Sequence, residues 1–261
     1  MGSVEGSAVK ESGARDSSPL PGYQRLDGEI PVFHPPGLEE RAVEARDLLE
    51  VGTTGLSEIL GVEPPELEAL LVSDDDWEHA PRENDRPYPL GLPYFTRASR
   101  PPVVVLPETL SPVFRPRTSA TEALSVWHEL AHAFLLREPM PRAPVWLREL
   151  VPQALSAAVA RRAGLRLGEH LERVDRSPGF TVRSFGARAD AERQMAFQNL
   201  LLALGTAALE EFGEGFLQTL AHALWREKDV VSEERAEELL ATSLGPGGRG
   251  WLESRPEFQE A

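Results

Sequence analysis

The spacing of hydrophobic and polar positions changes near residue 118 and divides the chain into two kinds of structure. Before this point the apolar runs are short and rich in β-branched residues or bounded by prolines, which predicts strands. These runs are "EIPVFHPP" at 29–36, "PELEALLVS" at 65–73 and "PPVVVLP" at 101–107. The prolines around the third run predict an edge strand. Residues 37–61 have helical spacing, but Gly52 and Gly55 weaken the middle and suggest two helices.

After residue 118, apolar residues recur with the spacing of amphipathic or buried helices. The expected helices cover residues 119–137, 145–164, 189–213, 214–229 and 232–245. Gly213 and Gly245 stand where the C-terminal end of a helix favours glycine. Strands first and helices second predict the α+β class.

Length and composition predict one folded domain with a tail. The chain has 261 residues, and residues 1–28 are rich in Gly, Ser and charge, which predicts a disordered tail before a single domain at 29–261. The chain has 42 acidic and 27 basic residues, which gives a net charge of -15. Because a phosphate backbone or an anionic membrane requires a basic surface, we expect neither nucleic acid nor membrane as a partner.

Two further features bear on location and chemistry. The N-terminal segment has no apolar core of signal-peptide length, and the longest apolar run, "NLLLALGTAAL", is too short to span a bilayer. We therefore expect a soluble, cytoplasmic protein. Cysteine is absent, so any zinc site must be built from histidine and carboxylate side chains.

The stretch "WHELAHAF" carries the clearest chemical signal. His128 and His132 are four residues apart and share one helix face, so both imidazoles can bind one ion. Glu129 leans to the side of that face, where its carboxylate can take a proton from a water that the metal acidifies. The alternative is a helix with chance histidines. The apolar flanks favour the metal, because ionisable groups in a buried helix need partners.

A catalytic zinc requires a third protein ligand and an open position. Glu149, in "PVWLRELVPQAL", is the best candidate, and sixteen residues separate it from His132. A proline-broken loop between the two helical stretches would let the second fold back on the first. The spacing leaves open the alternative of a surface glutamate on an amphipathic helix.

Together, "WHELAHAF" and "PVWLRELVPQAL" resemble the gluzincin metallopeptidases, the thermolysin-like and aminopeptidase-like group. The resemblance covers roughly residues 29–255 and is specific only at 128–153. It implies a zincin-like fold, with a small N-terminal mixed sheet, a buried His-Glu-x-x-His helix and a mostly helical C-terminal half. It also implies one zinc ion held by His128, His132 and Glu149, with Glu129 as general base.

Three departures from the gluzincin pattern concern the second helix and the oxyanion donor. Leu150 follows the third ligand where the family has Gly, and Pro152 should kink or start the helix. The family commonly supplies a downstream Tyr or His to hold the oxyanion, and this chain has no tyrosine after the motif. His222, with His170 behind it, and the upstream Tyr94 are donor candidates, and an arginine such as Arg148 or one near 183–193 could also serve.

Gln153 is a candidate for the layer of residues behind the ligands. It follows Glu149 by four residues, so it shares that helix face, and its amide oxygen can orient a ligand histidine. An exposed glutamine without a role is the alternative.

The sequence therefore predicts a zinc-dependent peptidase that hydrolyses peptide bonds in a peptide or protein substrate. The Gly-x-Met-Glu-Asn signature of related aminopeptidases is absent, which favours an endopeptidase. One alternative is a catalytically inactive zincin-fold binding or structural protein that retains the metal. Another is a metal-free helical interaction module.

Overall fold

The computed structural model describes residues 19–83, 88–114, 118, 120–138, 142–172, 179–185 and 190–259. Residues 1–18 of the expected tail lie outside these ranges. Residues 19–28 do not continue as a tail, because residues 24–26 form the first strand of the sheet and Leu20 is buried.

Five strands form one mixed sheet in the order β1-β2-β3-β5-β4. Their bounds are Gln24–Leu26 for β1, Val32–His34 for β2, Glu68–Val72 for β3, Tyr94–Thr96 for β4 and Val103–Pro107 for β5. β2, β3 and β5 are parallel, while β1 and β4 pair antiparallel at the two edges.

The prediction that residues 101–107 form an edge strand is wrong. β5 lies between β3 and β4, and all five of its residues are buried. A continuous Val-Val-Val-Leu run is typical of a strand covered on both faces, and its prolines stand at the ends, where they interrupt no ladder. The edge is instead the three-residue β4, which lies beside α2.

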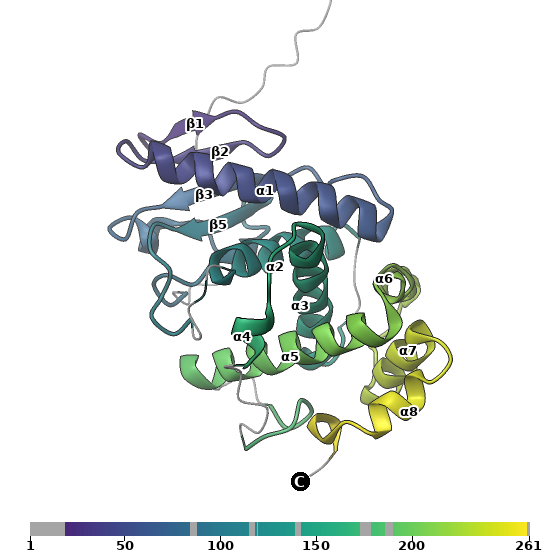
Figure 1. Ribbon diagram of the computed structural model, residues 1–261. Coiled ribbons are helices and arrows are strands. Elements are labelled where there is room, and N and C mark those ends of the chain that lie inside the picture. The colour runs from purple at the N-terminus through teal and green to yellow at the C-terminus, as the bar shows by residue number, and fades with distance from the viewer. Residues whose placement is uncertain are drawn as a thin grey trace, which may run out of the picture.

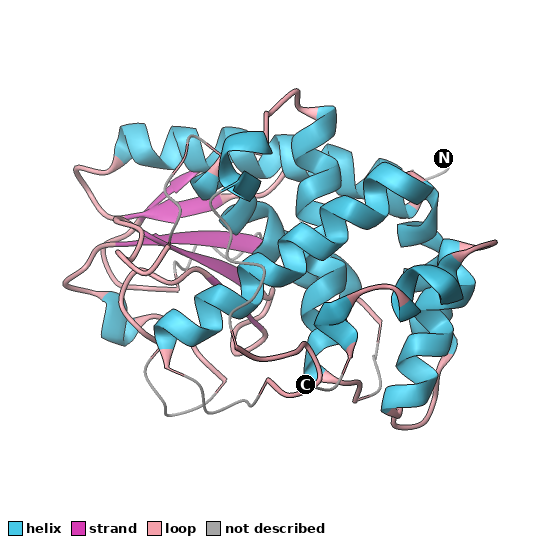
Figure 2. Cartoon of the chain, turned by 60° about the horizontal axis from the view of Figure 1, so that its bottom comes forward, coloured by secondary structure: helices cyan, strands magenta, loops and turns pink. Residues whose placement is uncertain are grey.

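Helices make up most of the remaining chain (Figure 1). Their bounds are Glu39–Leu60 for α1, Thr121–Leu135 for α2, Val145–Arg162 for α3, Gly168–Glu172 for α4, Ala191–Phe212 for α5, Gly215–Arg226 for α6, Glu233–Leu244 for α7 and Gly248–Glu253 for α8. Short 3-10 helices cover Trp77–His79 and Pro256–Phe258. Figure 2 shows the strands gathered at one side and helices over the rest, so the α+β class is confirmed.

Residues 39–60 form one helix rather than the two expected. Its glycines serve packing, because a Cβ on Gly52 would lie 2.5 Å from the ring of Trp127 on α2. At Gly55 a Cβ would lie 3.1 Å from Val159 on α3. The glycines thus let α2 and α3 approach α1 closely, and the burial of these contacts outweighs the low helix propensity.

α2 is buried on nearly every side and is tied to its neighbours in its middle and at its C-terminal end. The indole N–H of Trp127 donates to the carbonyl of Leu48 on α1 at 2.8 Å, and that of Trp225 on α6 donates to the carbonyl of Leu135 at 2.9 Å. α3 packs on α2 and α5, and Pro152 lies inside α3 rather than starting it. None of the helices in the described ranges is long and apolar enough to cross a membrane.

Candidate metal centre

Two imidazoles converge on one face of α2. His128 and His132 are separated by one helical turn, and their Nε2 atoms lie 3.1 Å apart. The rings are nearly perpendicular, at 82°, with centroids 4.7 Å apart. His128 is buried, and its Nδ1 atom has no hydrogen-bond partner among the described residues, so Nε2 is the atom that it presents to a ligand.

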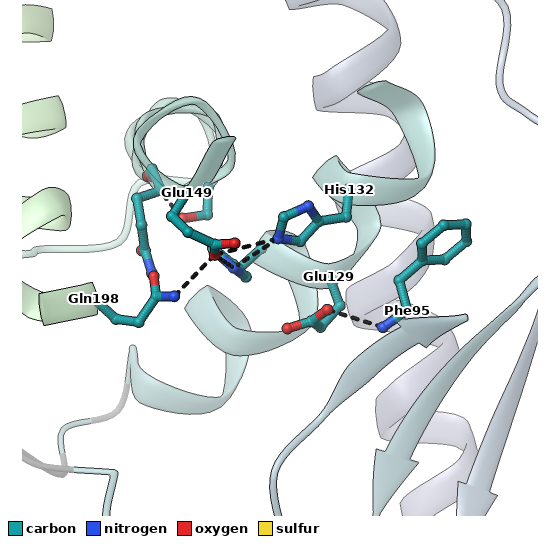
Figure 3. A network of polar contacts seen from close by, with 8 residues as sticks. Phe95, Glu129, His132, Glu149 and Gln198 are labelled. Atoms are coloured by element: carbon teal, nitrogen blue, oxygen red, sulfur yellow. Dashed lines mark hydrogen bonds and ion pairs between the residues drawn. The ribbon is translucent and has the colours of Figure 1, made fainter. Parts of the chain in front are cut away.

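Glu149 completes the cluster from α3. Its Oε2 atom lies 3.4 Å from Nε2 of His128 and 3.5 Å from Nε2 of His132. A tetrahedral zinc with ligands at about 2.0–2.1 Å keeps two ligand atoms about 3.3 Å apart, so the three observed separations fit such an ion. Figure 3 shows the carboxylate pointing at the imidazole of His132, so Glu149 is not a surface glutamate.

The charges in the cluster suit a cation. Burial alone would raise the pKa of Glu149, but His132 and hydrogen bonds with both imidazoles hold it well below its usual value. Burial opposes the charged form of His132, and the Glu149 carboxylate nevertheless raises the pKa of that imidazole. Glu149 is therefore ionised at neutral pH, as a metal ligand must be.

The side chain of Glu129 is directed away from this cluster and toward the sheet (Figure 3). Its Oε2 atom accepts the backbone N–H of Phe95 on β4 at 2.9 Å. Burial raises the pKa of Glu129, and the neighbouring imidazoles and the Phe95 N–H only partly offset this effect. A carboxylate with a raised pKa beside a group of possible metal ligands is suited to accept and return a proton.

Two glutamines lie behind Glu149. Gln198 on α5 donates from Nε2 to Oε2 of Glu149 at 2.9 Å, and Gln153 on α3 donates to Oε1 of Gln198 at 2.7 Å. Gln153 was expected to orient a ligand histidine, but its side chain contacts Gln198 instead, because this face of α3 turns toward α5. Gln198 is far from the motif in sequence, and no local pattern marks it.

A cavity of about 620 Å³ opens beside the cluster. We call Tyr88, Tyr94 and Phe95 its sheet wall. We call Glu149, Gln153 and Gln198 its helical wall. α2 lies between the two walls and contributes His128, Glu129 and His132.

The structure separates the residues considered as oxyanion donors. Tyr94 lines the cavity, but its hydroxyl donates to the carbonyl of Pro81 at 3.1 Å, and burial raises its pKa to about 12. His222 packs against Trp225 on α6, with ring centroids 5.1 Å apart, and is not among the described residues that line the cavity. His170 does line it, with Nδ1 3.3 Å from the hydroxyl of Thr118.

Tyr88 is a cavity residue that the motif spacing did not reveal. Its ring stacks on Tyr94 with centroids 4.1 Å apart, and its carbonyl accepts the indole N–H of Trp77 at 3.0 Å. Burial raises the pKa of Tyr88, and so do the charges of Glu129, Glu83 and Glu149, so the hydroxyl stays protonated at neutral pH.

Comparisons with known proteins find likeness to solved structures alone. No family model matches the chain, and no curated protein matches it. A solved structure, that of an M1 zinc metallopeptidase from Deinococcus radiodurans, aligns with 16% sequence identity and a TM-score of 0.49. The alignment covers 91% of this chain and 51% of that one, so the chain spans about half the length of that metallopeptidase.

Proposed function

We propose that this protein is a zinc-dependent peptidase whose single zinc ion is held by His128, His132 and Glu149. The observation that supports this proposal is the convergence of three ligand atoms, 3.1–3.5 Å apart, beside a fourth side chain held separately. That fourth group, Glu129, is turned away from the cluster but lines the same cavity.

When bound, zinc would supply a Lewis acid that polarises the scissile carbonyl and lowers the pKa of water. Glu129 takes a proton from the water that attacks the carbonyl carbon, and its raised pKa favours this transfer. The same carboxyl group then gives the proton to the nitrogen of the leaving amine. The Phe95 N–H holds one oxygen of Glu129 throughout, so the other oxygen carries the proton.

Tyr88 is our choice of donor to the oxyanion. Among the described residues, no hydrogen bond engages its hydroxyl, whereas the hydroxyl of Tyr94 is bound to the carbonyl of Pro81. Stacking on Tyr94 holds the Tyr88 ring and the bond from Trp77 holds its backbone carbonyl before the reaction begins, and such preorganised donors stabilise developing charge most effectively.

The substrate in this proposal is a peptide or protein cut within its chain. Glu129 and Glu149 are the acidic groups among the described residues that line the cavity, and both already have roles. A further carboxylate for a substrate's free amine is not found among those residues, which supports an endopeptidase over an aminopeptidase.

The test combines metal analysis with peptide digestion. We expect one zinc per chain, hydrolysis of a peptide library that a chelator abolishes, and a loss of about 10²–10⁴-fold in kcat for Glu129→Gln with zinc retained. Glu122→Gln is the matched control, because Glu122 lies on the same helix but pairs with Arg41. Zinc without hydrolysis in the wild type would indicate an inactive binding protein, and absence of zinc would refute the site.

A further inference from the structure

Helices α3 and α5 approach each other closely where they carry the two glutamines. A Cβ on Gly205 of α5 would lie 2.9 Å from Ala154 of α3, so only glycine fits there. Gly205 lies seven residues, or two turns, after Gln198 and shares its helix face. The close contact thus brings Gln198 within hydrogen-bond distance of both Glu149 and Gln153.

The amides of the two glutamines form a chain with one direction. Gln153 donates to the oxygen of Gln198, and Gln198 donates from its nitrogen to Glu149. Turning the Gln198 amide over would place its oxygen against the carboxylate and its nitrogen against the donor of Gln153, so both contacts would be lost. The ionised Glu149 carboxylate can only accept, so it selects the nitrogen end of Gln198, and the donor of Gln153 then holds the oxygen end in place.

Burial of these amides requires an explanation other than packing. Gln153 is 8% exposed, and its neighbours on α3 include Leu150 and Ala154, which are buried and apolar. An apolar side chain at 153 would avoid the free energy that a buried amide costs unless it is hydrogen-bonded. The bond that Gln153 makes leads only to Gln198, and from there to Glu149.

We propose that Gln198 and Gln153 act in series as positioning residues that hold the Glu149 carboxylate in its metal-binding orientation. This inference rests on the proposed zinc site. A neutral amide suits this task, because an arginine or lysine in its place would cancel the charge of Glu149 and compete with the cation. Glu149 keeps its full negative charge for the metal while one of its rotamers is favoured.

The test measures the zinc dissociation constant by competition with a chromophoric chelator. Gln198→Met keeps the length of the side chain and removes its donor, and we expect zinc affinity to fall about 10–100-fold. Gln153→Met should weaken binding less, since Gln198 can still reach Glu149. The double variant should bind zinc no more weakly than Gln198→Met alone, because the two residues act in series.

Gln218→Met is the matched control, since it removes an amide donor to the carbonyl of Leu60 far from the cluster and should leave zinc affinity unchanged. If Gln198→Met fails to fold, Gln198→Ala in the same assay takes its place. A wild type that binds no zinc would refute the proposed function itself. A wild type that binds zinc, with unchanged affinity in the folded Gln198 variant or additive losses in the double variant, would overturn this inference alone.

Discussion

The two walls of the cavity hold their carboxylates by different means. On the side of the sheet wall, Glu129 is held by a backbone N–H, that of Phe95 on β4. On the helical wall, Glu149 is held by the side-chain amide of Gln198. β4 is an edge strand, so part of its backbone is free to bind other groups. Backbone N–H groups inside α3 and α5 are already bonded within their helices, so only side chains can reach Glu149.

The same two carboxylates have pKa values shifted in opposite directions. Burial raises the pKa of Glu129, whereas the imidazoles overcome burial and lower that of Glu149 well below its usual value. When two neighbouring carboxyl groups have pKa values shifted apart in this way, each can take a different role in the same site. Glu129 is suited to exchange protons, and Glu149 is suited to remain ionised as a ligand.

The largest effect should come from breaking the cluster that the helical wall completes. His132→Ala removes one proposed ligand and also the main positive partner of Glu149. We expect loss of stoichiometric zinc and, in the metal-free protein, a loss of about 1–3 kcal/mol of unfolding free energy, because the Glu149 carboxylate keeps only His128 and Gln198 as partners among the described residues. Zinc content and thermal unfolding measure the two effects.

His222→Ala is the matched control for this variant. It also removes a histidine from a helix, but His222 is not among the described residues that line the cavity. Zinc content should therefore stay at the wild-type level. If His132→Ala kept its zinc, the assignment of the ligands to this cluster would be wrong.

A smaller effect, confined to turnover, should follow from a change in the sheet wall. Tyr88→Phe keeps the ring that stacks on Tyr94 and removes only the hydroxyl. We expect kcat to fall about a hundredfold while zinc affinity and KM change little, since the lost bond forms in the transition state. Steady-state kinetics on a peptide that the protein cleaves measure kcat and KM separately. A larger loss in Tyr94→Phe than in Tyr88→Phe would move the role to Tyr94.

Much of the centre is local in sequence and was therefore predictable. The spacing of His128 and His132 fixes their shared face through helix geometry alone. Placing Glu149 needed the second helix to fold back, which the proline-rich loop suggested and the resemblance to gluzincins supported. The structure brings all three side chains together.

The remaining features depend on packing between distant elements. Gln198 reaches Glu149 only because Gly205 allows α5 to approach α3, and no spacing within either helix encodes that contact. β4 is too short for its alternation to be recognised, so the edge of the sheet was assigned to β5. From local spacing alone, Gly52 indicates a break in the helix. Its real role is to leave room for the ring of Trp127, which lies 75 residues later in the sequence.

The smallest effect should come from the contact between α1 and α2, since α2 belongs to neither wall. Gly52→Ala would gain up to about 1 kcal/mol in helix propensity. The added Cβ, however, would lie 2.5 Å from the ring of Trp127, and overpacking of this kind costs about 1–3 kcal/mol. The ring cannot easily yield, because its N–H donates to the carbonyl of Leu48. We therefore expect a net loss of about 1 kcal/mol and a decrease of about 2–4 °C in Tm.

Gly215→Ala is the control for Gly52→Ala, because a Cβ on Gly215 of α6 meets nothing within 4 Å. Its Tm should stay the same or rise. Zinc affinity and kcat of Gly52→Ala should stay within a few-fold of the wild type, since His128, Glu129 and His132 all lie on α2 and a small shift of that helix moves them together. A selective loss of zinc affinity in this variant would show that the helical wall depends on the position of α2 and is not braced by Gln198 alone.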